Sequence, residues 1–201
     1  KLLSREQAIL EFNRRVLVQA QREDVPLLER LRYICIVSSN LDEFFEVRYA
    51  DVLEASRTPG TGIDPDYLKD VSRESHRLVD EQYRIFNDVV GPALREAGIH
   101  ILNHAHRDEA QRAWVADFFH RQVQPLLVPI GLDPSHPFPQ VANKTLNFIV
   151  RLGGRDAFGS DNDIAIVRIP RVLPRVIRVP AELSHGTQSF VLLDRKSTRL
   201  N

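Results

Sequence analysis

The sequence predicts an α+β fold, with an all-helical first part followed by a partial mixed α/β part. Apolar residues recur at steps of three and four through most of residues 4–97, a pattern typical of amphipathic helices. The pattern changes near Pro125, where five prolines within fifteen residues interrupt the helical periodicity. Short, β-branched, alternating runs follow at 146–152 and 164–169, and these predict strands.

Helix starts are marked by side chains that accept hydrogen bonds from free backbone N–H groups. Ser4 and Gln7 form a capping box, while Asp24 with Pro26 and Asp64 with a following proline each combine a cap with a first-turn proline. The third of these helices is expected to reach about Ala97, with Gly98 at its C-terminus. Further predicted elements are a strand at 99–102, a helix at 108–123 and a strand at 189–193.

Helical spacing also predicts which side chains are buried. The expected buried faces are Ile9, Phe12, Val16 and Ala20 in the first helix, Leu27, Leu28, Leu31, Ile34 and Cys35 in the second, and Leu68, Val71, Leu78, Tyr83, Phe86, Val90 and Leu94 in the long helix. Cys35, the single cysteine, excludes an internal disulfide framework and is expected to act as a small buried hydrophobe.

The stretch 38–48 organises the first part of the chain. Ser38, Ser39 and Asn40 can each cap a helix, and Ser39 stands three residues before Asp42, which approximates a capping box. We therefore predict that a separate helix begins after Asn40 and runs to about residue 57, burying Leu41, Phe44, Phe45, Val52 and Leu53. Because several caps are available, capping leaves Asn40 and Arg48 unexplained.

Two patterns in the sequence could indicate catalysis: a pair of acidic side chains and a cluster of metal ligands. Asp42 and Glu43 are adjacent, so on a helix they point in different directions, and acids favourable to a helix start are the preferred interpretation. His100, His104 and His106 lack nearby cysteines and a helical His-Glu-x-x-His pattern, so loop histidines are preferred over a metal cluster.

Composition excludes several classes of function. The formal net charge is zero, which disfavours general attraction to nucleic acid or anionic membrane. The sequence contains neither of the two glycine-rich phosphate-binding motifs, Gly-x-x-x-x-Gly-Lys and Gly-x-Gly-x-x-Gly. It also contains no Gly-x-Ser-x-Gly elbow. No apolar run approaches the roughly 20 residues of a membrane helix. No signal peptide is visible, so the cytoplasm is the predicted location, and the missing initiator methionine leads us to expect a piece of a longer protein.

One segment is locally basic. Four arginines and no acid occur between residues 164 and 181, and prolines prevent one regular helix there: Arg168, Arg171, Arg175 and Arg178. An extended segment of this kind suits an oligoanion, because guanidinium pairs with phosphate bidentately. A solvated edge strand explains the same residues, since charge and proline both protect sheet edges, and both interpretations stay open.

Several motifs together resemble the bacterial polyphosphate kinase family. The amino-terminal ones are Leu-Ser-Arg-Glu at 3–6, Phe-Asn-Arg-Arg-Val-Leu at 12–17, Pro-Leu-Leu-Glu-Arg-Leu-Arg at 26–32 and Ser-Ser-Asn-Leu-Asp-Glu-Phe-Phe at 38–45. The later ones are Asp-Pro-Ser-His-Pro-Phe-Pro at 133–139, Asn-Lys-Thr-Leu-Asn-Phe at 143–148 and Leu-Pro-Arg-Val-Ile-Arg-Val-Pro at 173–180. The resemblance covers nearly all of residues 3–194. One departure is Gln7-Ala8, where many members have tryptophan.

The residue pattern predicts a helical amino-terminal domain at 1–104 and a partial mixed domain at 105–194, which the resemblance implies is the head domain; residues 195–201 continue no pattern and are expected to be a non-native tail. The resemblance implies transfer of the terminal phosphate of ATP to polyphosphate through a phosphohistidine. That histidine and the magnesium-linked arginines belong to two carboxy-terminal domains outside these residues, so no catalytic or metal residue is expected here. Asn40 matches the family's ATP-contacting asparagine, and Arg175 matches an arginine of the head domain, which is implied to border the polyphosphate tunnel.

The implied partners are ATP, polyphosphate, the chain's own carboxy-terminal domains and a second copy in a homo-oligomer, with Mg²⁺ as the implied metal. Association with a membrane through a full-length complex stays open. The fragment alone is expected to be inactive. The alternative functions are a stand-alone helical interaction or dimerisation module and, disfavoured by the zero net charge, a nucleic-acid binder.

Overall fold

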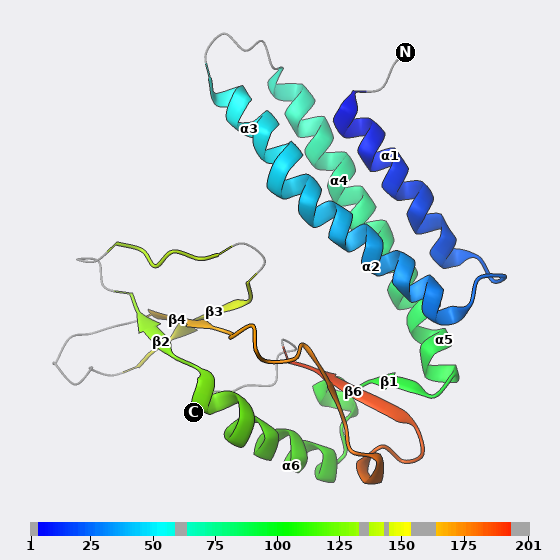
Figure 1. The fold of residues 1–201 in the computed structure, drawn as a ribbon, viewed down its shortest axis with the longest axis vertical. Coiled ribbons are helices and arrows are strands. Elements are labelled where there is room, and N and C mark those ends of the chain that lie inside the picture. Colours follow the sequence, from blue (N-terminus) through cyan, green and yellow to red (C-terminus); the bar gives the residue numbers. More distant parts are fainter. Residues whose placement is uncertain (1–3, 59–63, 133–136, 143–144, 154–163, 194–201) are drawn as a thin grey trace. The chain divides into compact units, whose positions relative to one another are not determined.

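The computed structural model describes residues 4–58, 64–132, 137–142, 145–153 and 164–193 (Figure 1). The chain forms two compact units, residues 1–98 and 99–201. The first unit is helical and the second combines helices with two small sheets, so the predicted α+β class is confirmed. The domain limits at 104 and 194 stay predictions, and the tail at 195–201 lies outside the described residues.

Three long helical segments build the first unit and alternate in direction (Figure 1). The first is α1 (Arg5–Val18), followed by a short 3₁₀ turn, η1 (Gln19–Gln21). The second joins α2 (Leu27–Glu43), the π-helical η2 (Phe44–Tyr49) and α3 (Ala50–Arg57). The third joins α4 (Pro65–Ile85), the π-helical η3 (Phe86–Val90) and α5 (Gly91–Glu96).

Most predicted helix ends are confirmed. Ser4 and Gln7 form the capping box of α1, and the Asp64 carboxylate accepts from the backbone N–H of Asp66 at 2.9 Å. Gly98 follows α5 with φ at +76°, a left-handed conformation that suits a residue without Cβ. The start of the second helix differs from the prediction, because α2 begins at Leu27 and Asp24 does not cap it. The Asp24 carboxylate instead accepts hydrogen bonds from the Arg22 guanidinium.

The predicted helix start after Asn40 is wrong. The helix continues through this stretch, and the backbone N–H of Phe44 bonds to the carbonyls of Asn40 and Leu41. Asp42 and Glu43 are therefore exposed residues near the end of α2, not acids at a helix N-terminus. Buried apolar residues at steps of three and four continue across the serines, and packing of this face outweighs their capping tendency. They are Ile34, Val37, Leu41 and Phe44.

Some helices bury a different face from the one that the residue spacing predicts. In α1 the fully buried face is Leu10, Asn13 and Leu17, continued by Ala20, and Phe12 is 51% exposed. Leu28, Cys35 and Tyr83 are also exposed, contrary to prediction. Each helix carries two overlapping stripes at helical spacing, and packing against neighbouring helices selects one. The predicted burial of Ile34, Leu41, Phe44, Val71, Leu78, Val90 and Leu94 is confirmed.

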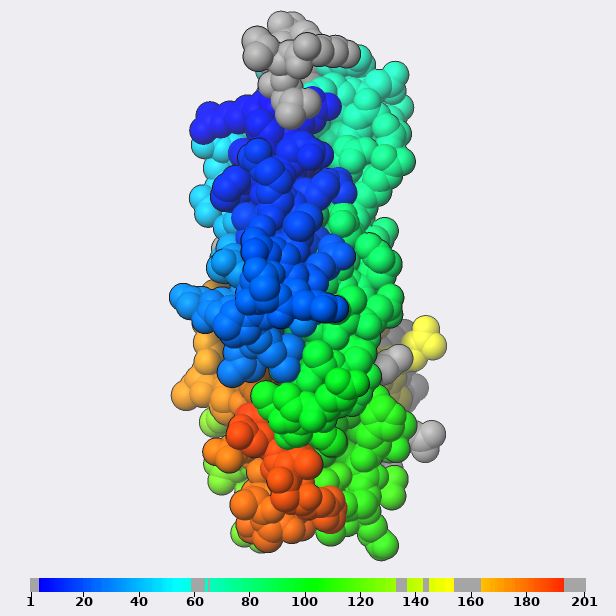
Figure 2. All heavy atoms as spheres, turned by 90° about the vertical axis from the view of Figure 1, so that its right-hand side faces the viewer, coloured from blue at the N-terminus to red at the C-terminus, as the bar shows by residue number. Residues whose placement is uncertain are grey.

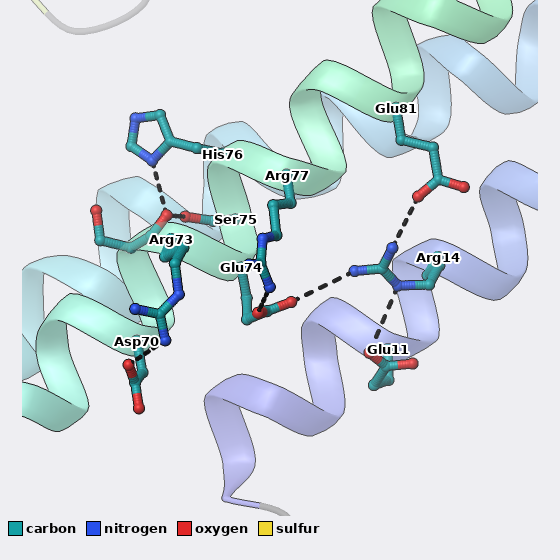
Figure 3. A network of polar contacts seen from close by, with 10 residues as sticks. Glu11, Arg14, Asp70, Arg73, Glu74, Ser75, His76, Arg77 and Glu81 are labelled. Carbon is teal, nitrogen blue, oxygen red and sulfur yellow. Dashed lines mark hydrogen bonds and ion pairs between the residues drawn. The ribbon is translucent and has the colours of Figure 1, made fainter.

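An ion-pair network joins α1 to α4. Figure 2 shows α1 in blue lying beside α4 in green, and Figure 3 shows Arg14 of α1 reaching two glutamates of α4. Its guanidinium lies 2.7 Å from Glu81 and 3.7 Å from Glu74, and also 3.5 Å from Glu11 on its own helix. Because these side chains are partly shielded and form a network, they align the two helices better than an isolated surface pair would.

The second unit contains β1 (Ile99–Ile101), α6 (Glu109–Phe118), the π-helical η5 (Phe119–Val123) and five further strands. These are β2 (Pro129–Gly131), β3 (Asn147–Arg151), β4 (Ile164–Arg168), β5 (Val176–Arg178) and β6 (Gln188–Leu192). One sheet has the order β1-β6-β5, with β1 parallel to β6, and the other is antiparallel with the order β2-β4-β3. The predicted helix at 108–123 and the predicted strands at 99–102, 146–152, 164–169 and 189–193 are confirmed, whereas β2 and β5 were not predicted.

Candidate functional site

A groove of about 300 Å³ lies in the first unit between α1 and the α2–η2 helix. Its volume is at the small end of the range for small-molecule sites. Nine residues line it: Arg5, Ile9, Phe12 and Asn13 from α1, and Asn40, Glu43, Phe44, Val47 and Arg48 from α2 and η2. Both sets follow steps of three or four residues, so each is one face of one helix.

The π-helical segment η2 forms part of the groove wall. Phe44, Val47 and Arg48 belong to it, directly after the α-helical turn that carries Asn40. A π-helical turn is rare, changes the direction in which side chains project, and is found frequently at functional sites. The local backbone therefore presents Val47 and Arg48 on the same wall as Asn40.

Two asparagines join the two walls through their side-chain amides. The Asn13 side chain, only 1% exposed, donates from Nδ2 to the carbonyl oxygen of Ile9 at 3.0 Å. Asn40 donates from Nδ2 to Oδ1 of Asn13 at 2.8 Å. Asn40 is half-buried, so its amide connects the buried Asn13 to the open groove.

The groove combines exposed apolar side chains with charge. Phe12 and Val47 are 51% and 44% exposed, although both are apolar. Arg5, Arg48 and Glu43 supply the charged groups, and within the described part of the chain no ion pair neutralises either arginine. An exposed aromatic ring can stack on a planar ligand, and an unpaired guanidinium can bind phosphate.

The structure brings Asn40 and Arg48, the two residues that capping left unexplained, into this one groove. It places Asn40 inside a helix and not at a helix N-terminus, so free backbone N–H groups beside Asn40 are not available to attract an anion. Sequence reasoning missed Arg5, Phe12 and Asn13 as groove residues. Asn13 carried a usable signal, because it is a polar residue at helical spacing between Leu10 and Leu17 on a buried face.

The other candidate clusters are less organised. Among the described residues, no group of three or more His, Cys, Asp or Glu side chains could hold a metal ion. The arginines at 168, 171, 175 and 178 are exposed, and Arg168 donates to the carbonyl oxygen of Gln140 at 2.8 Å. Arg178 lies on β5, an edge strand, so the solvated-edge interpretation fits it, and a role toward an oligoanion stays a prediction.

Comparison with known families identifies the chain. A model of the "Polyphosphate kinase N-terminal domain" matches residues 2–102, and one of the "Polyphosphate kinase middle domain" matches residues 110–195. The chain belongs to the polyphosphate kinase family. Polyphosphate kinase from Neisseria meningitidis serogroup B is 49% identical over 199 residues, and that from Burkholderia multivorans is 50% identical over 198.

The structural comparison agrees with this family. The crystal structure of polyphosphate kinase from Porphyromonas gingivalis superposes with a TM-score of 0.81 at 28% identity, over 96% of this chain. The chain spans 29% of the length of that protein and of the Neisseria and Burkholderia relatives. In the described part of the chain, no helix is both long and apolar enough to cross a membrane.

Proposed function

We propose that this chain forms the amino-terminal part of a polyphosphate kinase and that its groove binds the nucleoside end of ATP. The full-length enzyme would transfer the terminal phosphate of ATP to polyphosphate through a phosphohistidine in another part of the polypeptide. The observation that carries the proposal is the convergence of Asn40, an exposed Phe12 and two arginines, Arg5 and Arg48, in one groove. Asn40 also matches the family's ATP-contacting asparagine.

Each groove residue has a role that suits a nucleotide. The ring of Phe12 offers a stacking face for the base, and the Asn40 amide offers hydrogen bonds to its edge. Arg5 and Arg48 offer positive charge toward the phosphates, since planar guanidinium pairs with phosphate oxygens in two parallel hydrogen bonds.

Magnesium would be held outside this chain. We assign its site to the carboxy-terminal domains and the substrate phosphates, because Mg²⁺ is usually held by one or two carboxylates together with phosphate oxygens and waters. We propose those domains, polyphosphate and a second enzyme copy as partners of the full-length protein, with the cytoplasm as its location. Purified residues 1–201 should then incorporate no labelled phosphate from ATP into polyphosphate.

The test of the nucleotide site uses the full-length enzyme with Asn40→Ala and, as a matched control, Ser39→Ala on the adjacent exposed residue. Loss of a hydrogen bond to the nucleotide should raise the KM for ATP about tenfold in Asn40→Ala. The control should leave it unchanged. Thermal melts should show a lower midpoint for Asn40→Ala, equivalent to about 1–3 kcal/mol, because the change leaves the buried Oδ1 of Asn13 without its donor, so KM is compared at a temperature where both proteins are folded. An unchanged KM for ATP in Asn40→Ala would remove Asn40 from the site.

A further inference from the structure

We propose that Asn13 is a positioning residue that orients the Asn40 amide so that the groove prefers adenine to 6-oxopurines such as hypoxanthine and guanine. This inference rests on the proposed nucleotide site and concerns the substrate specificity of that site. It follows from the two amide hydrogen bonds that connect Ile9, Asn13 and Asn40.

The direction of these bonds is set by a backbone carbonyl. The carbonyl oxygen of Ile9 can only accept, so the Asn13 atom that lies 3.0 Å from it must be the amide nitrogen. The Asn13 oxygen is then turned toward Asn40, and the Asn40 atom 2.8 Å away must also be an amide nitrogen. Because Asn13 is 1% exposed, water has little access to replace either bond.

This arrangement defines what Asn40 presents to a ligand. Its Oδ1 makes no hydrogen bond within the described residues, and one N–H of its Nδ2 is not used by Asn13. An acceptor beside a donor matches adenine, whose exocyclic amine donates and whose adjacent ring nitrogen accepts. Hypoxanthine and guanine carry a carbonyl oxygen at that position, which would face the Asn40 oxygen with no hydrogen between them.

Without Asn13 the preference would weaken. A free asparagine side chain can rotate by half a turn and exchange its oxygen and nitrogen, so it can serve either kind of purine. Anchoring by Asn13 removes this freedom, since rotation would place the Asn40 oxygen against the Asn13 oxygen. Asn40 would thus contact the base, whereas Asn13 would act only through Asn40.

The experiment measures kcat/KM for ATP and for inosine triphosphate (ITP) in the full-length enzyme, comparing Asn13→Leu with Asn13→Asp. Leucine removes the anchor at similar size, whereas the aspartate carboxylate still accepts from Asn40 and preserves its orientation. We expect the ATP-to-ITP ratio to fall at least about fivefold in Asn13→Leu, given the discrimination typical of paired amide contacts to a base. Asn13→Asp should keep the ratio, although both variants lose the bond to Ile9 and some stability.

An unchanged ratio in Asn13→Leu would overturn the positioning role, and would leave the ATP site in place provided that Asn40→Ala still raises the KM. A second measurement needs no variant. The wild-type enzyme should prefer ATP to purine riboside triphosphate, which lacks the amine, and should prefer that compound to ITP. Equal kcat/KM values for the three nucleotides would contradict the proposal even if Asn13→Leu did not fold.

Discussion

Among the described residues, each compact unit buries one arginine, and the two arginines differ in their partners. Arg30 in the helical unit is 9% exposed, and its Nε donates to the carbonyl oxygen of Ala20 at 2.8 Å. Arg107 in the second unit is 4% exposed, its Nε has no partner among the described residues, and one Nη donates to Leu102 over 3.5 Å. Burial lowers the pKa of Arg107, because desolvation disfavours the charged guanidinium.

The difference arises from where free backbone acceptors lie. Ala20 belongs to the 3₁₀ turn after α1, where helix carbonyls have no partner within the helix, so Arg30 acts as a cap. Two other buried side chains donate to carbonyls inside helices, Gln82 to that of Ile34 at 2.9 Å and Asn13 to that of Ile9 at 3.0 Å. Burying polar groups stabilises a protein only when they are paired, and the helical unit pairs each of these three with a carbonyl.

The largest expected effect concerns apolar packing in the helical unit. Phe44→Ala should destabilise this unit by about 3–5 kcal/mol, because Phe44 is 2% exposed and its loss leaves a cavity. Phe45→Ala, on the half-buried neighbouring ring, is the matched control and should cost less. Urea denaturation, monitored by hydrogen exchange of the amides in each unit, measures the loss of stability in both variants. Equal small effects would show that the helix register described for η2 is incorrect.

A backbone contact provides the next test. A Cβ at Gly91 would lie 2.8 Å from the carbonyl oxygen of Phe86, where η3 passes into α5, whereas no atom of the described residues lies within 4 Å of a Cβ at Gly153 in the second unit. Gly91→Ala should therefore destabilise the protein by about 1–3 kcal/mol through overpacking. Gly153→Ala should be close to neutral. The comparison of thermal midpoints would contradict this account if Gly91→Ala melted like wild type.

Replacing each buried arginine with methionine tests whether the difference in their partners affects stability. Arg30→Met leaves the Ala20 carbonyl unpaired and should cost about 1–3 kcal/mol. Arg107→Met removes a buried charge with an unpaired Nε, so it should be neutral or stabilising, as replacement of buried ions by apolar groups often is. Urea midpoints of both variants test this. A loss of stability in Arg107→Met as large as that in Arg30→Met would show that Arg107 is well paired.

The smallest effect is a pH dependence in the second unit. The pKa of Asp108 lies below its ordinary value because its carboxylate accepts from the backbone N–H of Gln111 and from His185. A lowered carboxyl pKa stabilises the fold above the ordinary value of about 4, and this contribution is lost as pH falls through the folded-state pKa. Asp108→Asn keeps a capping side chain without the charge, so its thermal midpoint should fall less between pH 6 and pH 3. Identical pH profiles would exclude this contribution.

The sequence predicted much of this fold correctly, because the relevant signals are local. The caps at Ser4 and Asp64, the glycine after the long helix and the longer strands depend on neighbours in the chain. The site was predicted only in part. Asn40 was predicted as a site residue because it matches an asparagine of the family. Arg48 stood out only because helix capping does not explain it. Arg5 and Phe12 gave no local signal of a binding role. Phe12 looked like a core residue because its spacing fits an apolar stripe.

Local signals in the sequence specify where helical periodicity begins and ends, that Ser4 and Asp64 cap helices, and that a mixed α/β part follows. Which of two overlapping stripes in α1 is buried depends on the surfaces of α2 and α4, so it is set by tertiary packing. Tertiary packing also decides that the helix runs unbroken through Asn40, since the continuous face of Ile34, Val37, Leu41 and Phe44 gains more by packing than two serines gain by capping. The pairing of Asn13 with Asn40 joins residues 27 positions apart, and no local pattern specifies it.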